Sequence, residues 1–403
     1  MSRLQGALGL LAIYLLAYLV SRHRRRINWR TLGIGLVLQV VFAIAVLKWT
    51  PGRTALAWLA RQVAKLVGYA DQGSSFLFGR LLVGKGTIFA LNVLPVIIFL
   101  GALIGLLYYL RVIQWFVEIV GGAISWLLRT SKVESVWAAT VIFLGQSEAP
   151  LVIAPYLRRL TKSELFAVMT GGFASVAGST LVGYSLLGAP LKYLLAASVM
   201  NAPASLIMAK AIYPETETSS VQASVRDVRD EESVNVIDAT ARGALSGGRL
   251  AVIVGCLLIA FIALIGLANG IVGGVGSWFG VGGLTFQKLL GWVFAPVAWL
   301  IGVPWHDAGV AGGFLGEKTV LNEFVAYSSF GPQIPHLASK TVLITTFALA
   351  GFANFGSIAI QIGALGGLAP ERRGDVAKFG LLALLAGTLA NLTNAAIVGI
   401  VGS

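Results

Sequence analysis

Long, uninterrupted apolar runs recur along this chain, and they limit the folds that it can adopt. Several runs approach the ~20 residues that an α-helix needs to cross a lipid bilayer, and hydrophobic residues make up 57% of the sequence. A transmembrane β-barrel would instead show short segments in which apolar and polar residues alternate. The sequence therefore predicts an all-α polytopic membrane protein.

The basic residues, which give the chain a net charge of +13, lie in short clusters between the apolar runs. Clusters of this kind are typical of the cytoplasmic loops of membrane proteins, so we expect a lipid bilayer and no nucleic acid as the partner of these charges. The arginine-rich residues 21–30 follow the first run, which places the N-terminus outside the cytoplasm. The later clusters place the C-terminus outside as well. A bacterial inner membrane is the expected location.

The apolar runs predict eight transmembrane helices, at residues 4–20, 32–47, 88–110, 165–187, 191–213, 250–275, 341–365 and 379–401. Two further apolar stretches contain polar residues and are expected to form re-entrant hairpins, which protein or a water-filled cavity must surround. The first is residues 136–156; the second is residues 286–327, with the glycine-rich residues 309–316 as its turn. Residues 51–69 and 111–129 have an amphipathic helical pattern. The former is expected to lie at the membrane interface or to pack as a peripheral helix.

Residues 316–327, with the sequence GEKTVLNEFVAY, concentrate charge in a protein of which only 12% of the residues are charged. Glu317, Lys318, Asn322 and Glu323 lie here between apolar neighbours. An ionised side chain at bilayer depth costs at least ~2.5–3.5 kcal/mol. The cluster therefore lies either in a loop outside the membrane or in the interior at a place that a polar molecule passes.

A short sequence occurs twice, as GFASVAGS at residues 172–179 and as GFANFGS at residues 351–357. Each copy lies within an expected span and follows a hairpin that contains a glutamate, Glu148 in the first and Glu323 in the second. Because the first unit starts from the cytoplasm and the second from outside, the two are inverted repeats. Secondary transporters built in this way hold substrate and ions near the middle of the membrane, between broken helices.

The hairpin tips and the interrupted spans would bring together a set of amides, hydroxyls and carboxylates: Gln146, Ser147, Glu148, Ser179, Thr180, Asn322, Glu323, Asn354 and Ser357. These donors and acceptors suit a neutral polar ligand such as a sugar or a nucleoside. A metal site would need a cluster of His, Cys or acidic residues, and hydrolysis would need a nucleophile paired with a base. The sequence reveals neither, so we expect no cofactor and no enzymatic activity.

With these residues in view, nearly the whole chain resembles the concentrative nucleoside transporter family, especially its bacterial eight-span members. The family signature is Gly or Ala, any residue, Lys, three residues, then Asn-Glu-Phe-Val-Ala and an aromatic residue or Met. Gly316, Lys318 and residues 322–327 meet it in full. The hairpin motif Gly-Gln-Ser/Thr-Glu is met by residues 145–148, and Phe-Ala-Asn followed by a serine is met by residues 352–357.

The resemblance implies a homotrimer in which a scaffold holds a mobile transport part that moves as an elevator. It implies scaffold helices at 1–130, a first transport repeat at 131–213, a scaffold span at 250–280 and a second transport repeat at 281–403. The polar residues 214–249 between the two halves are expected to form a cytoplasmic linker that is partly helical. The residues that would face the nucleobase are Gly145, Gln146, Ser147, Glu148 and Thr180. The residues that would hold the ribose are Glu323, Asn354 and Ser357, with Phe352 nearby.

One position departs from the family pattern. Sodium-coupled members carry an asparagine four residues before the hairpin glycine, where this chain has Val141. Ser175 and the backbone at Leu144 and Val176 remain, but valine offers no side-chain oxygen to a hard cation. We therefore expect coupling to H⁺, with Glu323 or Glu148 titrating as substrate binds, since removal from water favours the neutral form of a carboxyl group. Na⁺ held by the remaining oxygens is the alternative.

The function that the resemblance implies is nucleoside symport across the inner membrane. Three alternatives stay open: a Na⁺-coupled symporter, a symporter for another polyhydroxylated solute, and a nucleoside sensor or channel without coupled transport. The sequence leaves the choice between purine and pyrimidine nucleosides open.

Overall fold

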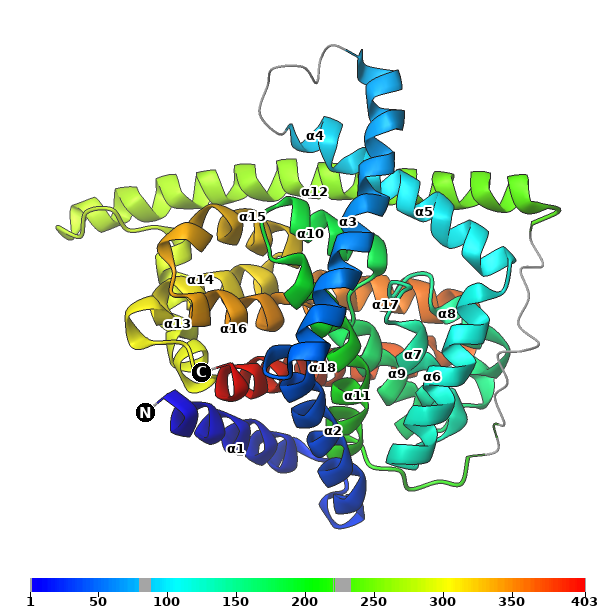
Figure 1. Ribbon diagram of the computed structural model, residues 1–403. Helices are drawn as coiled ribbons and strands as arrows, with labels where there is room; N and C mark the ends of the chain where they lie inside the picture. Colours follow the sequence, from blue (N-terminus) through cyan, green and yellow to red (C-terminus); the bar gives the residue numbers. More distant parts are fainter. Residues whose placement is uncertain (1, 80–87, 220, 222–232, 403) are drawn as a thin grey trace.

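The computed structural model describes residues 2–79, 88–219, 221 and 233–402, and every regular element in these ranges is a helix (Figure 1). This confirms the all-α class. The chain begins with α1 (Ser2–Val20), α2 (Trp29–Leu47), α3 (Thr50–Phe78), α4 (Phe89–Asn92), α5 (Leu94–Tyr109) and α6 (Val112–Leu128). It continues with α7 (Lys132–Thr140), α8 (Pro150–Ile153), η3 (Ala154–Arg159), α9 (Lys162–Ala174), α10 (Gly178–Leu186) and α11 (Leu191–Ile212). The remaining helices are α12 (Val236–Trp278), α13 (Phe286–Leu300), α14 (Trp305–Val320), α15 (Glu323–Gln333), α16 (Ser339–Leu349), α17 (Phe355–Leu368) and α18 (Arg373–Val401).

Seven stretches of the described chain are long and apolar enough to cross a membrane, and they correspond to seven of the eight expected spans. These stretches are α1, α2, α4 with α5, α9 with α10, α11, α12 and α18. The eighth expected span, residues 341–365, is divided into α16 and α17 by the non-helical residues 350–354. The polar residues 354–357 of the repeated sequence predict an interruption of this span, and in the structure it begins four residues earlier, at residue 350.

The same order of elements occurs twice in the chain. In the first copy α6 is followed by the hairpin α7–η3, the broken helix α9–α10 and the unbroken helix α11. In the second copy α13 is followed by the hairpin α14–α15, the broken helix α16–α17 and the unbroken helix α18. We name the hairpin of residues 132–159 hairpin 1 and that of residues 305–333 hairpin 2. The internal repeat expected from the two similar sequences is therefore present in the fold.

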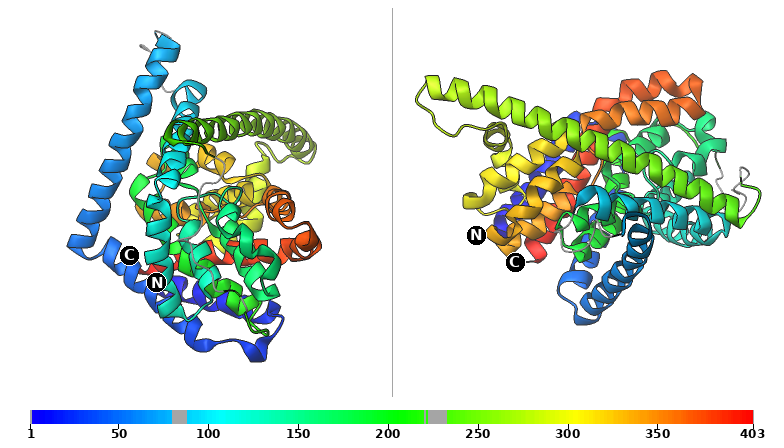
Figure 2. Two further views of the ribbon diagram at one scale, coloured as in Figure 1. Left: turned by 90° about the vertical axis from the view of Figure 1, so that its right-hand side faces the viewer. Right: turned by 90° about the horizontal axis from the view of Figure 1, so that it is seen from above.

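The broken helix α9–α10 and its neighbour α11 occupy the interior of the molecule. In the apolar segment of residues 162–186, 94% of the residues are buried, and in that of residues 191–212 the proportion is 89%. In the apolar segment of α12 only 22% of the residues are buried. Figure 2 shows α3 and α12 along the periphery of the bundle. The apolar side chains of α12 lie exposed on this outer surface, as an environment of lipid or another apolar surface requires.

The expectation that residues 309–316 form the turn of the second hairpin is wrong. These residues lie inside α14, and the turn of hairpin 2 is formed by Leu321 and Asn322 between α14 and α15. The glycines serve packing instead: a Cβ atom on Gly312 would lie 2.6 Å from the backbone of Ala295 on α13. Small residues that let two helix backbones approach closely are common in membrane proteins.

The linker expected at residues 214–249 is helical in its second part. Residues 236–249 belong to α12, which continues without interruption into the span and which Asn235 caps by accepting a hydrogen bond from the backbone N–H of Asp238. The polar residues of this part form the first turns of a long helix, as expected of a partly helical linker. Residues 220 and 222–232 of the linker lie outside the described residues.

Helices α5 and α12 pack through glycines on both sides of their contact. A Cβ atom on Gly101 would lie 2.6 Å from the carbonyl oxygen of Gly243, and one on Gly247 would lie 2.6 Å from that of Ile97. Neither position can accept a side chain unless the helices move apart. Gly248, the next residue along, has open space around its Cβ position.

We predict that Gly247→Leu lowers the apparent melting temperature of the purified protein in detergent, because overpacking of this kind typically costs ~1–3 kcal/mol. Gly248→Leu is the matched control, since both changes raise helix propensity by the same amount. Differential scanning fluorimetry measures the effect. Equal melting temperatures for the two variants would contradict the close packing of α5 on α12.

Candidate binding site

The two broken helices cross at their breaks in the interior of the protein. Helix α9 ends at Ala174, and its C-cap Ser175 has extended backbone. The carbonyl oxygen of Ser175 accepts a hydrogen bond from the backbone N–H of Phe352, in the other break, at 3.1 Å. The membrane interior offers no water to unpaired peptide groups. Each break therefore supplies a hydrogen-bond partner for a backbone group of the other break.

The tip of hairpin 1 folds against the first break. The backbone N–H of Gly178, the first residue of α10, donates to the carbonyl oxygen of Phe143 at 3.0 Å. Ser198 on α11 donates its hydroxyl to the carbonyl oxygen of Ile142 at 3.1 Å. Two helices of the first repeat therefore fix the position of this tip.

A chain of four polar side chains connects the two hairpins through the second break. Gln146 at the tip of hairpin 1 donates to the hydroxyl of Ser357 at 2.8 Å. The backbone N–H of Ser357 donates to Oδ1 of Asn354, the N-cap of α17, at 2.9 Å. Asn354 Nδ2 then donates to Oε2 of Glu323 on hairpin 2 at 3.0 Å. All four residues are buried, and we call them the polar chain.

Both ends of the polar chain have additional partners that the sequence analysis missed. The hydroxyl of Tyr184 on α10 donates to Oε1 of Glu323 at 3.0 Å. Gln361 on α17 donates to Oε1 of Gln146 at 3.3 Å. Each lies four residues after an expected site residue on the same helix, Tyr184 after Thr180 and Gln361 after Ser357, and residues four apart share one helix face. That spacing was a usable signal for both.

The other expected site residues lie beside the polar chain. Glu148 bonds within its own tip, where Oε2 accepts the backbone N–H of Gly145 at 3.1 Å. Ser147 is exposed and Thr180 is buried, with its hydroxyl bonded to the carbonyl oxygen of Ala177. Phe352 lies in the second break. Neither Ser147 nor Glu148 forms part of the polar chain.

Asn322 and Ser179, which were expected near the site but not in contact with the nucleoside, have local structural roles. Asn322 is the N-cap of α15 and accepts the backbone N–H of Val325 at 2.9 Å, and Ser179 is buried in the first turn of α10. At the proposed ion position, Val141 is the buried C-cap of α7, and the hydroxyl of Ser175 donates to the carbonyl oxygen of Gly172 at 2.9 Å.

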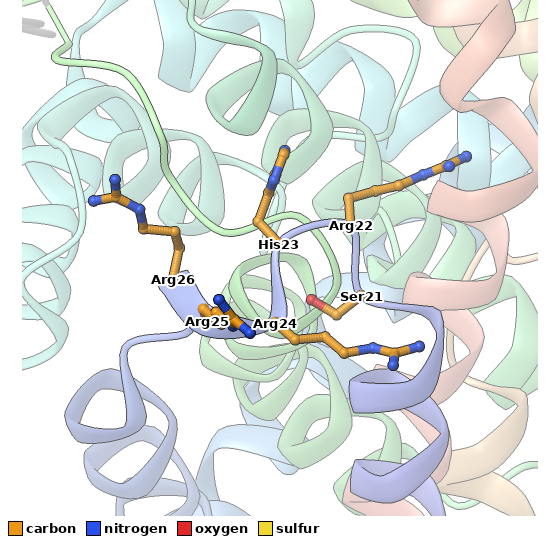
Figure 3. Close-up of a pocket in the computed structure, with 6 residues that line it drawn as sticks. All are labelled: Ser21, Arg22, His23, Arg24, Arg25 and Arg26. Atoms are coloured by element: carbon orange, nitrogen blue, oxygen red, sulfur yellow. The ribbon is translucent and has the colours of Figure 1, made fainter.

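A surface pocket at the loop between α1 and α2 belongs to a different part of the chain. Its lining residues are Ser21, Arg22, His23, Arg24, Arg25 and Arg26. Figure 3 shows that the arginine side chains spread away from one another instead of converging. They form an open basic surface of the kind found in cytoplasmic loops and take no part in the polar chain.

Three family models match consecutive parts of the chain. A model described as the N-terminus of the Na⁺ dependent nucleoside transporter matches residues 8–81. A model described as nucleoside recognition matches residues 90–191. A model of the C-terminus of the Na⁺ dependent nucleoside transporter matches residues 193–399.

Similar proteins cover the chain from end to end. The uncharacterized transporter YutK of Bacillus subtilis is 54% identical over 99% of this chain and 99% of its own length. The nucleoside permease NupC of Helicobacter pylori is 43% identical over 99% of this chain and 98% of its own. A solved structure of CNTnw in an inward-facing substrate-bound state has a TM-score of 0.95 and 47% identity, and covers 100% of this chain and 99% of that one.

We predict that Tyr184→Phe destabilises the protein more than Tyr327→Phe does. Both tyrosines are fully buried, but Tyr327 donates to a neutral acceptor, the carbonyl oxygen of Thr346, whereas Tyr184 donates to a carboxylate oxygen. Hydrogen bonds to charged groups contribute ~1.5–3 kcal/mol and neutral ones ~0.5–1.5 kcal/mol. Apparent melting temperatures in detergent compare the two. A larger loss for Tyr327→Phe would contradict an ionised Glu323.

Proposed function

Because the chain belongs to the concentrative nucleoside transporter family, we propose that it is a symporter that imports nucleosides across the bacterial inner membrane with protons as the coupling ion. The single observation that carries the proposal is the polar chain, which connects both hairpin tips through the second break. A polar solute that entered between the hairpins would meet amide, hydroxyl and carboxylate groups from both repeats.

The chemistry of these groups suits the two halves of a nucleoside. Gln146 with Gly145, Ser147, Glu148 and Thr180 would face the nucleobase, whose edge presents both donors and acceptors. Glu323, Asn354 and Ser357 would hold the ribose hydroxyls, with Phe352 beside the sugar. A nucleoside would replace bonds that the side chains make to one another, such as Gln146 to Ser357. The desolvation cost of binding is then low, since each group exchanges one partner for another.

Proton coupling is proposed from the position of Val141. Its apolar side chain is buried at the end of α7, beside the tip of hairpin 1, where sodium-coupled members carry an asparagine oxygen. Ca²⁺, Mg²⁺ and other hard cations bind through oxygen ligands, and the same preference applies to Na⁺. Loss of one such ligand favours a proton carrier, for which Glu323 and Glu148 are the candidates.

The distribution of burial supports an elevator mechanism. We assign the interior repeats, residues 131–213 and 281–403, to a moving transport part. Residues 1–130 and 250–280, which include the peripheral helices, are assigned to a scaffold, with the linker between the halves in the cytoplasm. The exposed apolar surface of the scaffold would then contact lipid and, in a homotrimer, other copies of the chain. Figure 1 shows both termini at one end of the molecule, and we place that end outside.

We predict that an inward pH gradient alone drives accumulation of radiolabelled uridine in proteoliposomes, and that a Na⁺ gradient alone does not. Glu323→Gln should abolish uptake, since it removes the carboxylate from the proposed ribose contacts. Glu371→Gln is the control, because Glu371 is a half-exposed surface residue paired with Arg158. Uptake driven only by Na⁺ would overturn the coupling, and absence of uptake under both gradients would overturn the substrate class.

We predict that Val141→Asn makes uridine uptake sensitive to Na⁺, because the amide oxygen supplies the ligand that valine lacks. Val141→Leu is the matched control: leucine branches at Cγ as asparagine does, but has no oxygen. Initial uptake rates at several Na⁺ concentrations, at constant pH and ionic strength, measure the effect. The same Na⁺ response in both variants would contradict the role assigned to this position.

A further inference from the structure

Lys318 carries a buried charge that the polar chain does not use. It lies in the last turn of α14, just before the tip of hairpin 2, and only 2% of it is exposed. A buried ammonium group is stable only where its donors find partners. Nζ of Lys318 donates to the carbonyl oxygen of Ala348 and to Oδ1 of Asn391, both at 2.8 Å.

Both partners belong to the crossing of the broken helices. Ala348 lies in the last turn of α16. The last four carbonyl groups of a helix have no N–H donor within that helix, so they need a partner from elsewhere. Asn391 on α18 donates to the carbonyl oxygen of Ala174 at 2.9 Å and to that of Ala350 at 3.0 Å, and so joins the ends of α9 and α16. Lys318 therefore attaches hairpin 2 to the residue that holds the two breaks together.

Asn201 and Asn394 enlarge this cluster. Asn201 on α11 donates to the carbonyl oxygen of Ala350 at 2.8 Å and accepts Nδ2 of Asn394 at 2.8 Å. The side chains come from hairpin 2 and from the last helix of each repeat. Because α11 and α18 are both largely buried, the anchor for Lys318 is a rigid one.

Hairpin 2 thus contacts the second break on both sides, with a basic residue on one side and an acidic residue on the other. Lys318 meets the C-terminal end of α16, where the helix dipole is negative, and Glu323 bonds Asn354 at the N-terminal end of α17, where it is positive. Each charge complements the helix end that it faces. Gly351, between these ends, has no room for a side chain, since a Cβ atom there would lie 2.2 Å from Asn391.

We propose that Lys318 is a positioning residue for transport: it fixes the tip of hairpin 2 on the second break, and so holds Glu323 and Asn354 in the geometry that binds the nucleoside, without touching the ligand itself. The part of this inference that concerns the nucleoside rests on the proposed function. The part that concerns the hairpin does not depend on the substrate.

The test is Lys318→Met, which keeps the length of the side chain and removes the charge and the donors. We expect amide hydrogen exchange to increase at least tenfold in residues 318–325 and 350–354, with no change at the tip of hairpin 1, residues 141–149. Uridine affinity, measured by calorimetry, should fall at least tenfold, or about 1.4 kcal/mol. Thr319→Val is the control, since the hydroxyl of Thr319 bonds within its own helix, to the carbonyl oxygen of Leu315.

Two further variants separate the contribution of the positive charge from that of the hydrogen-bond donors. They also test the proposal if Lys318→Met does not fold. Lys318→Arg keeps the charge and should retain more uridine affinity than Lys318→Gln, which offers a neutral donor. Equal affinities for these two variants would overturn the role of the charge. Unchanged exchange in hairpin 2, or an equal increase in both hairpins, would overturn the positioning role. If the unmodified protein fails to bind uridine, the proposed function fails, and the exchange comparison still decides the role of Lys318.

Discussion

The structure depends on pairing the peptide groups that become free where helices end inside the membrane. Unpaired backbone groups in hydrocarbon cost several kcal/mol each, and the breaks in α9–α10 and α16–α17 place such groups in the middle of the protein. The bond from Phe352 to Ser175 pairs one break with the other. Asn391 pairs with carbonyl oxygens of both. Each break therefore depends on the other for hydrogen-bond partners, and these bonds connect the two repeats.

The same requirement explains why the polar chain lies where it does. Asn354 caps α17 with its oxygen and leaves its amide nitrogen for Glu323. Gln146 approaches α17 from the opposite hairpin. A helix end inside a membrane needs polar side chains for its own stability, and each such side chain has bonding capacity left over. The side chains that stabilise the end of a broken helix can therefore also bind a polar solute.

The sequence predicted what depends on local pattern. The apolar runs located the spans, and the repeated sequence located both breaks, because a glycine-rich, polar interruption differs visibly from a continuous apolar helix. It misassigned residues 309–316, since glycine promotes both turns and close helix packing, and contacts such as that of Gly312 with Ala295 distinguish the two only in the structure. It also missed the cluster at Lys318, in which Asn391 donates to Asn201, a residue 190 positions away in the sequence.

The two hairpins are held by different side chains although the repeats share one order of elements. Hairpin 1 is held at its base, where Glu134 in the first turn of α7 forms a buried ion pair with Lys210 of α11, and Lys210 also donates to Ser163 on α9. Hairpin 2 is held at its base by Asp307, whose carboxylate accepts the hydroxyl of Thr341 and the backbone N–H of Ala338, and beside its tip by Lys318. A buried charge that loses its partner costs several kcal/mol, so each attachment resists separation. The two hairpins therefore differ most near their tips: neutral hydrogen bonds from Gly178 and Ser198 hold the tip of hairpin 1, whereas the amino group of Lys318 holds the tip of hairpin 2.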